Sequence, residues 1–305
     1  MHPPHAVPTA NTRPPAWPKR LFQGRAGFMA LVLAYAVLVL ACLGTLLAAG
    51  DLSLGRNPWD NLLKSLGELA RPSFVDLWWG PERLEYRSDD GTLLRVENRQ
   101  AVEAQFLAAV ARATWTTFQI ATLGSLLAAV LALPLGVLAA RNLHAPRWAA
   151  RGASAVLDVC RAVHTLVFGL VLVGIVGLGP TAGILAIALH SMGTYGKLYA
   201  ESLETLDMGA IEAVRATGAS PSQVLFSAVW PSVLPQWVSN HLYVWEFNIR
   251  DSTILGLIGA GGLGLLISEA VSLFQWSRLA TLLLVVVALV MAFDALSRRI
   301  RQALL

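Results

Sequence analysis

Residues 207–235, DMGAIEAVRATGASPSQVLFSAVWPSVLP, form a polar stretch between long apolar segments, and they decide how the chain is organised. Asp207 is a residue type that begins helices, because its carboxylate can accept a backbone N–H bond. Gly218 suits the position just after a helix end, where the backbone turns left-handed at little steric cost. Ser220 and Gln223 have the spacing of a capping box, with a proline at the first helical position. The stretch therefore predicts a helix, a glycine turn and a second helix, which we call the elbow.

Composition places the chain in a membrane. Of its 305 residues, 55% are hydrophobic and 14% are charged, whereas soluble domains average about 25% charged residues. The net charge of +4 is too small to indicate a nucleic-acid partner. Cys42 and Cys160 both fall in apolar segments, so we interpret them as small buried hydrophobic residues rather than as a disulfide.

Apolar stretches long enough to cross a bilayer, which takes roughly 20 residues, recur along the chain. We predict an all-α, polytopic membrane helix bundle with six transmembrane helices, at residues 26–50, 113–140, 154–176, 181–197, 226–249 and 275–293. Pro134 is expected to kink the second span, and Arg278 to snorkel outward from the start of the sixth. The alternative for the first span is a cleaved signal peptide, but its apolar stretch exceeds the roughly 7–15 residues of a signal sequence.

The segments between the spans give the domain organisation. Residues 1–25 are basic and proline-rich and are expected to form a disordered cytoplasmic tail, and residues 298–305 form a second tail. Residues 51–112 hold both acids and bases and a predicted hairpin around an Asp-Gly turn, so we interpret them as a small extracytoplasmic segment. Residues 113–297 are expected to form a five-helix core that carries the elbow at 207–231.

The distribution of basic residues predicts the orientation. They gather in both tails and at residues 141–161. The positive-inside rule places such segments in the cytoplasm. We therefore expect a multi-pass protein of the bacterial inner (cytoplasmic) membrane, with both termini and the elbow on the cytoplasmic side.

Catalytic and metal-binding motifs are missing from the sequence. There is no His-Glu-x-x-His, no Gly-x-Ser-x-Gly, no Cys-x-x-Cys and no Walker A phosphate loop. We therefore expect a protein that is not an enzyme, with no catalytic residue, metal or cofactor of its own. If ATP drives the protein, another chain must hydrolyse it.

Ionisable side chains at membrane depth are costly, so they are candidates for function by default. The predicted ones are Asp158, Arg161, His164, His190, His241 and Glu246. Asp158 and Arg161 stand three residues apart on one helix and are expected to form an ion pair. His190 and His241 are interpreted as hydrogen-bonded core histidines rather than as ligands.

A polar, glycine-rich run follows the outer end of the predicted fifth span. The candidate residues of a translocation pathway or gate are Glu246, Asn248, Arg250, Ser252, Thr253, Gly261 and Gly262. Arg250 is the candidate contact for an anion, because a buried charge needs a partner; the alternative is that it only pairs with Glu246 one turn earlier. The glycines fit either close helix packing or irregular backbone lining a cavity, and we favour the cavity.

The elbow also resembles a known motif. The spacing of Glu212, Ala213 and Val214, then Gly218, then Pro231 matches the EAA loop, EAA-xxx-G-x9-I-x-L-P, of the membrane subunits of ABC importers. The second Ala, the Ile and the Leu of the motif are replaced here. The resemblance implies that these residues form a coupling helix that sits in a groove of the ATPase. The alternative is an amphipathic connector of no special function.

A wider resemblance covers residues 141–301. GTYGKLYAE at 193–201 and WEFNIRDSTILG at 245–256 look like the phosphonate-type permeases, whereas the GAGGLG run at 259–264 is also similar to methionine and glycine-betaine permeases. The phosphonate-type resemblance implies a type I ABC importer that moves phosphonate, phosphite or phosphate by alternating access.

The same resemblance implies the partners. They are two ABC ATPase subunits that hold ATP and Mg, a second permease subunit (the same chain or a paralogue), and an extracytoplasmic substrate-binding protein. Three alternatives stay open: an ABC permease for another small solute of the methionine or glycine-betaine type, an ion-coupled secondary transporter that uses Glu246 or the histidines as proton relays, and a membrane-embedded enzyme.

Overall fold

A computed structural model describes residues 25–50, 57–79, 83–87, 92–142 and 146–304 of the chain. The predicted N-terminal tail therefore lies outside the described residues. The chain divides into two units, residues 1–62 and 63–305. α2 (Pro58–Leu69) contains the boundary between them.

The first unit contains α1 (Arg25–Ala49), the helix predicted as the first span. Its side chains from residue 28 onward are all exposed, and they are apolar on every side, as expected for a helix that faces lipid. Cys42 is exposed with the rest of the helix, so the prediction that it is buried is wrong for this residue.

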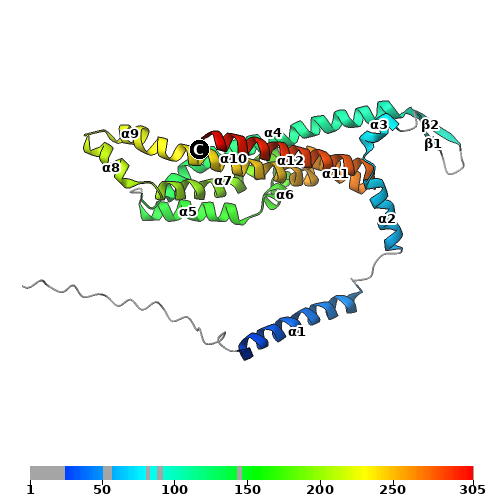
Figure 1. Cartoon of the computed structure of the whole chain (residues 1–305), viewed down its shortest axis with the longest axis horizontal. Coiled ribbons are helices and arrows are strands. Elements are labelled where there is room, and N and C mark those ends of the chain that lie inside the picture. The colour runs from blue at the N-terminus through cyan, green and yellow to red at the C-terminus, as the bar shows by residue number, and fades with distance from the viewer. Residues whose placement is uncertain (1–24, 51–56, 80–82, 88–91, 143–145, 305) are drawn as a thin grey trace, which may run out of the picture. The chain divides into compact units, whose positions relative to one another are not determined.

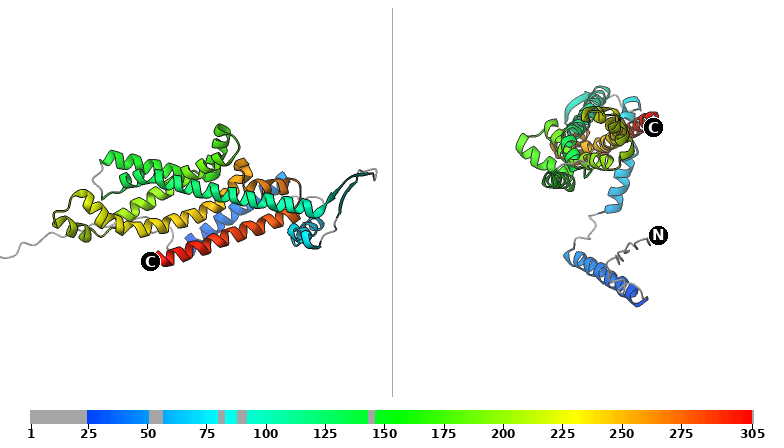
Figure 2. Two further views of the ribbon diagram at one scale, coloured as in Figure 1. Left: turned by 90° about the horizontal axis from the view of Figure 1, so that it is seen from above. Right: turned by 90° about the vertical axis from the view of Figure 1, so that its left-hand side faces the viewer.

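The second unit is an α-helical bundle, which confirms the predicted fold class (Figures 1 and 2). Its main helices are α4 (Arg99–Ala139), α5 (Arg147–Ala162), α6 (Thr165–Val176), α7 (Pro180–Glu204), α8 (Met208–Ala216), α9 (Pro221–Val224), α10 (Trp230–Leu255), α11 (Leu263–Ser272) and α12 (Trp276–Leu304). α8 and α9 lie at one end of this bundle, and the strands β1 and β2 lie at the opposite end (Figure 1).

α7 lies at the centre of the bundle and packs against α4, α5, α6 and α10. Small residues let these helices approach closely. A Cβ atom on Gly136 of α4 would lie 2.9 Å from the carbonyl oxygen of Gly196, and one on Gly193 would lie 2.5 Å from that of Leu157. Tyr195 and Leu157 fill the space between the helices and are fully buried.

Helix length and composition alone do not confirm the six predicted spans. In the part of the chain that the structure describes, α1, α4 and α12 are long and apolar enough to cross a membrane, and two bent helix pairs raise the total to at most five. α7, the predicted fourth span, does not qualify because it is rich in small and polar residues. A central helix can carry such residues, since the neighbouring helices and not the lipid surround it.

The predicted third span, residues 154–176, is not one helix. α5 and α6 meet at a 90° bend. The bend arises because Val163 is extended and the ring of His164 caps α6, its Nδ1 accepting the N–H of Leu166 at 3.2 Å.

Two other predicted spans are longer in the structure. α4 begins at Arg99 rather than at residue 113, because the Asn98 side chain accepts the N–H groups of the first turn; Pro134 lies inside this helix without ending it. The predicted fifth span continues through α10 and the π-helical turn at 256–260, so most of the predicted loop at 250–274 is helical.

The segment before α4 contains the predicted hairpin. β1 (Arg83–Arg87) pairs antiparallel with β2 (Leu93–Asn98), with Glu85 opposite Val96; the predicted Asp-Gly turn lies outside the described residues. The segment also contains a 3₁₀ turn (Ser73–Val75) and α3 (Asp76–Trp79).

This segment is fastened to the bundle by polar contacts with α12. The backbone N–H of Ser73 donates to Thr281 Oγ1 at 2.9 Å. Arg278, which was predicted to snorkel outward, contacts α4. Its guanidinium lies 5.0 Å from the centre of the Phe106 ring and 4.0 Å from Glu103 Oε1 on α4.

Candidate functional site

The first half of the elbow forms as predicted. The Asp207 carboxylate accepts the N–H of Gly209 at 2.9 Å and so caps α8. The helix ends at Ala216 with Thr217 as its C-cap residue, and Gly218 follows with a φ of 82°. A residue with a Cβ atom adopts that backbone at a cost, which explains why glycine stands there.

The second half also starts as predicted, with a capping box. Ser220 N–H donates to Gln223 Oε1 at 2.8 Å, and Gln223 N–H donates to Ser220 Oγ at 3.4 Å. α9 then continues through a π-helical turn at 225–229 into α10. Pro231 stands in the first turn of α10, where its missing N–H removes a helical hydrogen bond. The elbow and the predicted fifth span are therefore one bent but uninterrupted helical path.

The elbow holds its shape with few apolar contacts and leaves its outer face open. Ile211, Val224 and Ala228 form a small buried cluster inside it. Glu212, Ala213, Gly218 and Pro231 are exposed, and Val214 is half-buried. Of the residues predicted to couple to an ATPase, Glu212, Ala213 and Val214 thus lie on α8, at one end of the bundle (Figure 1). Gly218 lies in the turn after α8, and Pro231 lies in the first turn of α10.

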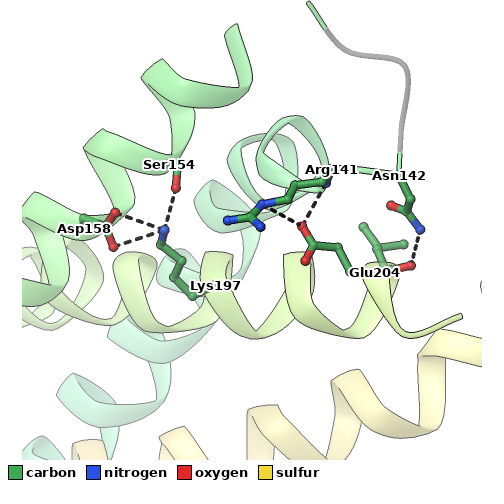
Figure 3. Close-up of polar contacts among 7 residues, drawn as sticks. Arg141, Asn142, Ser154, Asp158, Lys197 and Glu204 are labelled. Atoms are coloured by element: carbon green, nitrogen blue, oxygen red, sulfur yellow. Dashed lines mark hydrogen bonds and ion pairs between the residues drawn. The ribbon is translucent and has the colours of Figure 1, made fainter. Parts of the chain in front are cut away.

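Polar contacts fasten the base of the elbow to α4, and sequence reasoning missed them (Figure 3). Arg141 N–H donates to Glu204 Oε1 at 2.9 Å, and Asn142 Nδ2 donates to the carbonyl oxygen of Leu203 at 2.6 Å. Both acceptors lie in the last turn of α7, immediately before the elbow. A pocket of about 530 Å³ on another side of this junction is lined from α7, α8 and α10, with Asp207 and Asn240 among its polar residues.

The predicted pathway residues do not gather in one place. Asn248 is fully buried and joins three helices. Its Oδ1 accepts from Ser191 Oγ on α7 at 2.9 Å, and its Nδ2 donates to Ser125 Oγ on α4 at 2.8 Å. Asn248 and Ser191 line a pocket of about 210 Å³, together with His190, Thr194, Tyr243, Val244 and Phe247. Uncharged hydrogen-bonding groups therefore lie in the interior of the bundle.

Arg250 points elsewhere. Its guanidinium donates to Glu246 Oε1 at 2.8 Å and lies 5.9 Å from the centre of the Phe247 ring. The Arg250 side chain is half-exposed, whereas Glu246 is mostly buried. The ion pair of Arg250 with Glu246, which was the alternative interpretation of the sequence, is thus present. It lies within α10 rather than at the outer end of a span, because the helix continues to Leu255.

The hydroxyls of Ser252 and Thr253 are engaged inside their own helix. Both donate to the carbonyl oxygen of Ile249, at 2.8 Å and 3.3 Å. Sequence reasoning missed the neighbouring Asp251, which is only 5% exposed. Its Oδ2 accepts from Thr165 Oγ1 at 2.6 Å, and this bond joins α10 to α6. An acid between the predicted pathway residues Arg250 and Ser252 was the signal that could have found it.

The glycine-rich run has both an irregular backbone and close packing, and the cavity expected beside it stays a prediction. Gly259, Gly261 and Gly262 have positive φ values, so the backbone is irregular there, and α10 and α11 meet at a 59° bend. The run is also closely packed. A Cβ atom on Gly262 would overlap Thr117 Oγ1, and that hydroxyl accepts the N–H of Leu263 at 2.8 Å.

The remaining ionisable residues have protein partners. Asp158 lies 3.9 Å from Arg161, as predicted, but its nearer partner is Lys197 of α7 at 3.1 Å. His190 Nδ1 lies 2.8 Å from the carbonyl oxygen of Val163, and His241 Nδ1 lies 3.0 Å from the Tyr195 hydroxyl. Both histidines are therefore hydrogen-bonded in the bundle, in line with their interpretation from the sequence.

Comparison with known proteins gives the same picture of the helical core. Residues 132–305 match the family model described as "Binding-protein-dependent transport system inner membrane component". The phosphite transport system permease protein of Stutzerimonas stutzeri is 40% identical over 187 residues, which are 61% of this chain and 68% of that protein. The phosphate-import permease protein of Mycolicibacterium smegmatis is 38% identical over 189 residues, 62% of this chain and 36% of that protein.

A solved structure shares the fold. It is an inward-facing form of the MetNI methionine ABC transporter, one chain of which superimposes with a TM-score of 0.58 at 24% identity. The alignment covers 65% of this chain and 97% of that one. At this identity the likeness concerns the fold alone, and it includes the core helices rather than the whole chain.

Proposed function

The chain belongs to the family of binding-protein-dependent transport system inner membrane components, and from this membership we propose that it is the permease subunit of an ABC importer for a phosphorus oxyanion. The observation that supports the proposal most is the elbow, an exposed and well-capped helix with Glu212 and Ala213 on its open face. The substrate class rests on the phosphite and phosphate permeases that are about two-fifths identical to this chain.

The proposed partners follow from the same premise. Two ATPase subunits hold ATP and Mg, a second permease subunit completes the pathway, and an extracytoplasmic binding protein delivers the anion. The elbow docks in the ATPase on the cytoplasmic side of the bacterial inner membrane, where both termini also lie. This orientation places β1 and β2, at the opposite end of the bundle, outside (Figure 1).

The geometry supports a mechanical route from the elbow to the interior. Residues 221–260 form one helical path, so a push on the elbow moves Asn248 and Asp251 with it. Both residues are hydrogen-bonded to other helices, to Ser191 and Ser125 and to Thr165. The π-helical turn at 225–229 and the bend at Gly259 to Gly262 are the two places where the path can flex.

The pathway is proposed to bind the anion weakly. The pocket beside Asn248 offers neutral donors, such as the hydroxyls of Thr194 and Tyr243. Arg250 remains the proposed charged contact, released from Glu246 when the helices move. Weak binding suits a transporter whose selectivity resides in a binding protein, because a tight site would hold the substrate.

The function is tested by transport in proteoliposomes. The full chain is reconstituted with the ATPase that co-purifies with it and with the soluble binding protein from the same source. We expect ATP-dependent accumulation of phosphite, methylphosphonate or phosphate, and none of methionine. Accumulation of methionine would overturn the substrate class, and accumulation driven by a proton gradient without ATP would overturn the ABC mechanism.

The orientation is tested by cysteine labelling. In a variant without Cys42 and Cys160, a cysteine replacing the exposed Leu93 of β2 should react with a membrane-impermeant thiol reagent in intact cells with a permeabilised outer membrane. A cysteine replacing Ser220 should react only after the inner membrane is opened. The reverse pattern contradicts the proposed orientation.

A further inference from the structure

A basic pocket lies at the elbow end of the bundle, between the end of α4 and the start of α5. Its volume is about 390 Å³. It is lined by Ala139, Ala140, Arg141, Arg147, Ala150, Arg151 and Ser154. Three of these residues are arginines and none is acidic, so the pocket carries a concentrated positive charge.

The acidic residues nearby are engaged with other partners. Asp158, one helical turn beyond Ser154, pairs with Lys197 at 3.1 Å. Glu204 accepts the backbone N–H of Arg141 at 2.9 Å, and its carboxylate lies 4.0 Å from the Arg141 guanidinium. Within the described part of the chain, Arg147 and Arg151 form no ion pair with a carboxylate. Their charges are therefore not neutralised by a carboxylate of the residues that the structure describes.

The placement of these two arginines is unfavourable without a ligand. Arg147 is the first residue of α5, and Arg151 stands one turn later. The N-terminal end of a helix carries a partial positive charge, which disfavours cations and favours anions. The first turn of α5 contains no acidic residue, and no side chain caps it. An anion in the pocket would meet the arginines and the helix dipole together.

We propose that this pocket binds a phosphate-type oxyanion, presented either as the headgroup of an anionic lipid or as a free anion from the cytoplasm. Arg147 and Arg151 would contact its oxygens, because a guanidinium matches phosphate geometry with two parallel N–H bonds. Arg141 is 91% exposed and can turn from Glu204 toward the anion. Ser154 also lines the pocket.

The face of α5 beside the pocket favours the lipid source. Trp148, Val156 and Val159 are exposed and lie along one side of the helix, next to the side that carries Arg147 and Arg151. An apolar stripe bordered by arginines and a tryptophan is typical of a helix at the boundary between acyl chains and headgroups. Basic pockets between helices on the cytoplasmic side are a known way to hold lipid headgroups.

The pocket is connected to the elbow through α7 (Figure 3). Lys197 Nζ donates to Ser154 Oγ at 2.6 Å and to Asp158 Oδ2 at 3.1 Å, which fastens α5 to α7. The contact of Arg141 with Glu204 reaches the last turn of α7, directly before the elbow. An anion that engages Arg141 and Arg147 would therefore link α4 and α5 at the base of the helix that leads to the elbow.

The proposal is tested on the full chain in lipid nanodiscs. One arm adds phosphatidylglycerol to phosphatidylcholine discs, and the other titrates inorganic phosphate into discs of phosphatidylcholine alone. The readouts are the midpoint of thermal unfolding and the lipids retained in native mass spectrometry. The Arg147→Gln/Arg151→Gln variant should bind whichever of the two ligands is effective with an affinity lower by about tenfold or more, as expected for the loss of charge-assisted hydrogen bonds. The affinity of the Arg147→Lys/Arg151→Lys variant should lie between that of the wild type and that of the glutamine variant.

The matched control is Arg299→Gln/Arg301→Gln, which removes the same charge from the C-terminal end of α12, outside the pocket. A response to phosphatidylglycerol that the pocket variant loses and the control keeps supports the lipid source. The same pattern with phosphate alone supports a free anion. If the Arg147→Gln/Arg151→Gln variant and the Arg299→Gln/Arg301→Gln control respond equally to each ligand, the proposed site is wrong. It is also wrong if the pocket variant responds like the wild type to both ligands but no longer holds the ATPase, because the arginines would then serve that protein.

Discussion

The elbow and the interior around Asn248 are joined by one helical path, but they depend on different kinds of contact. The elbow is shaped by bonds between residues two or three apart, such as Asp207 with Gly209 and Ser220 with Gln223. Asn248 is held by Ser125, 123 residues earlier in the chain. Because of this difference, we expect substitutions in the interior to destabilise the fold first. Substitutions in the elbow should instead stop transport in a protein that still folds.

The largest effect is expected at Gly262, where close packing and a positive φ occur together. Gly262→Ala adds a Cβ atom that overlaps Thr117 Oγ1 at a φ of 71°. We expect a loss of about 3 kcal/mol or more in the free energy of unfolding, because steric overlap adds to backbone strain. Gly261→Ala is the matched control, since its φ is 86° but its nearest neighbour would lie at 3.9 Å. Thermal unfolding in detergent measures both, and equal losses would contradict the role of Thr117.

The second effect concerns Asn248 itself. Asn248→Leu leaves the buried hydroxyls of Ser125 and Ser191 without their partner, and we expect a loss of about 2–3 kcal/mol. Asn240→Leu is the control on the same helix, because Asn240 accepts only an exposed bond from Gln236 at 3.3 Å. Chemical unfolding followed by circular dichroism compares the two variants. Similar midpoints would show that burial of the hydrogen bonds does not decide the stability.

The third effect should separate function from folding in the elbow. Gly218→Val forces a β-branched residue into a φ of 82° in open space, with no neighbour within 4 Å. The free energy of unfolding should fall by about 1–2 kcal/mol, while ATPase association and uptake are lost. Gly218→Asn should retain both, because asparagine tolerates left-handed backbone. Pull-down of the ATPase and uptake in proteoliposomes check this, and normal uptake by the valine variant would remove the elbow from the coupling mechanism.

The smallest effect on stability is expected at the pair of the half-exposed Arg250 and the mostly buried Glu246. Replacing both with Gln and Met should change the free energy of unfolding by about 1 kcal/mol or less, because removing both charges together leaves neither of them unpaired. Transport separates the two roles of Arg250. If the pair is structural, uptake by the double variant is largely preserved; if Arg250 meets the anion, uptake falls in both Arg250→Met and the double variant. Preserved uptake by Arg250→Met removes it from the pathway.

The sequence predicted the elbow well because its determinants are local. A cap at Asp207, a left-handed glycine at 218 and the capping box at Ser220 each act within one helical turn. The hairpin is predicted for the same reason, since neighbouring segments pair across a short connection. The fold class followed from hydropathy alone.

The errors occur where distant residues decide the outcome. The bend between α5 and α6 depends on the His164 ring and on packing against α7, which no hydropathy profile contains. α4 extends back to Arg99, where Asn98 caps it, and Glu103 in these added turns lies 4.0 Å from Arg278 of α12, a contact that the local sequence cannot show. Asp251 and the Lys197 partner of Asp158 were missed because the three-residue and four-residue spacings of one helix cannot show contacts between helices.

The length of α4 has one further consequence. Its 41 residues rise by about 1.5 Å each, so the helix measures roughly 60 Å, about twice the hydrocarbon thickness of a bilayer. The part from Arg99 to Arg112, with its charged residues, is therefore expected to extend beyond the acyl chains together with the start of α12, which it contacts, and it carries the hairpin at its end. A small tilt of the helix within the membrane swings this end through a wider arc. The length of α4 thus amplifies movements of the bundle into displacements outside it.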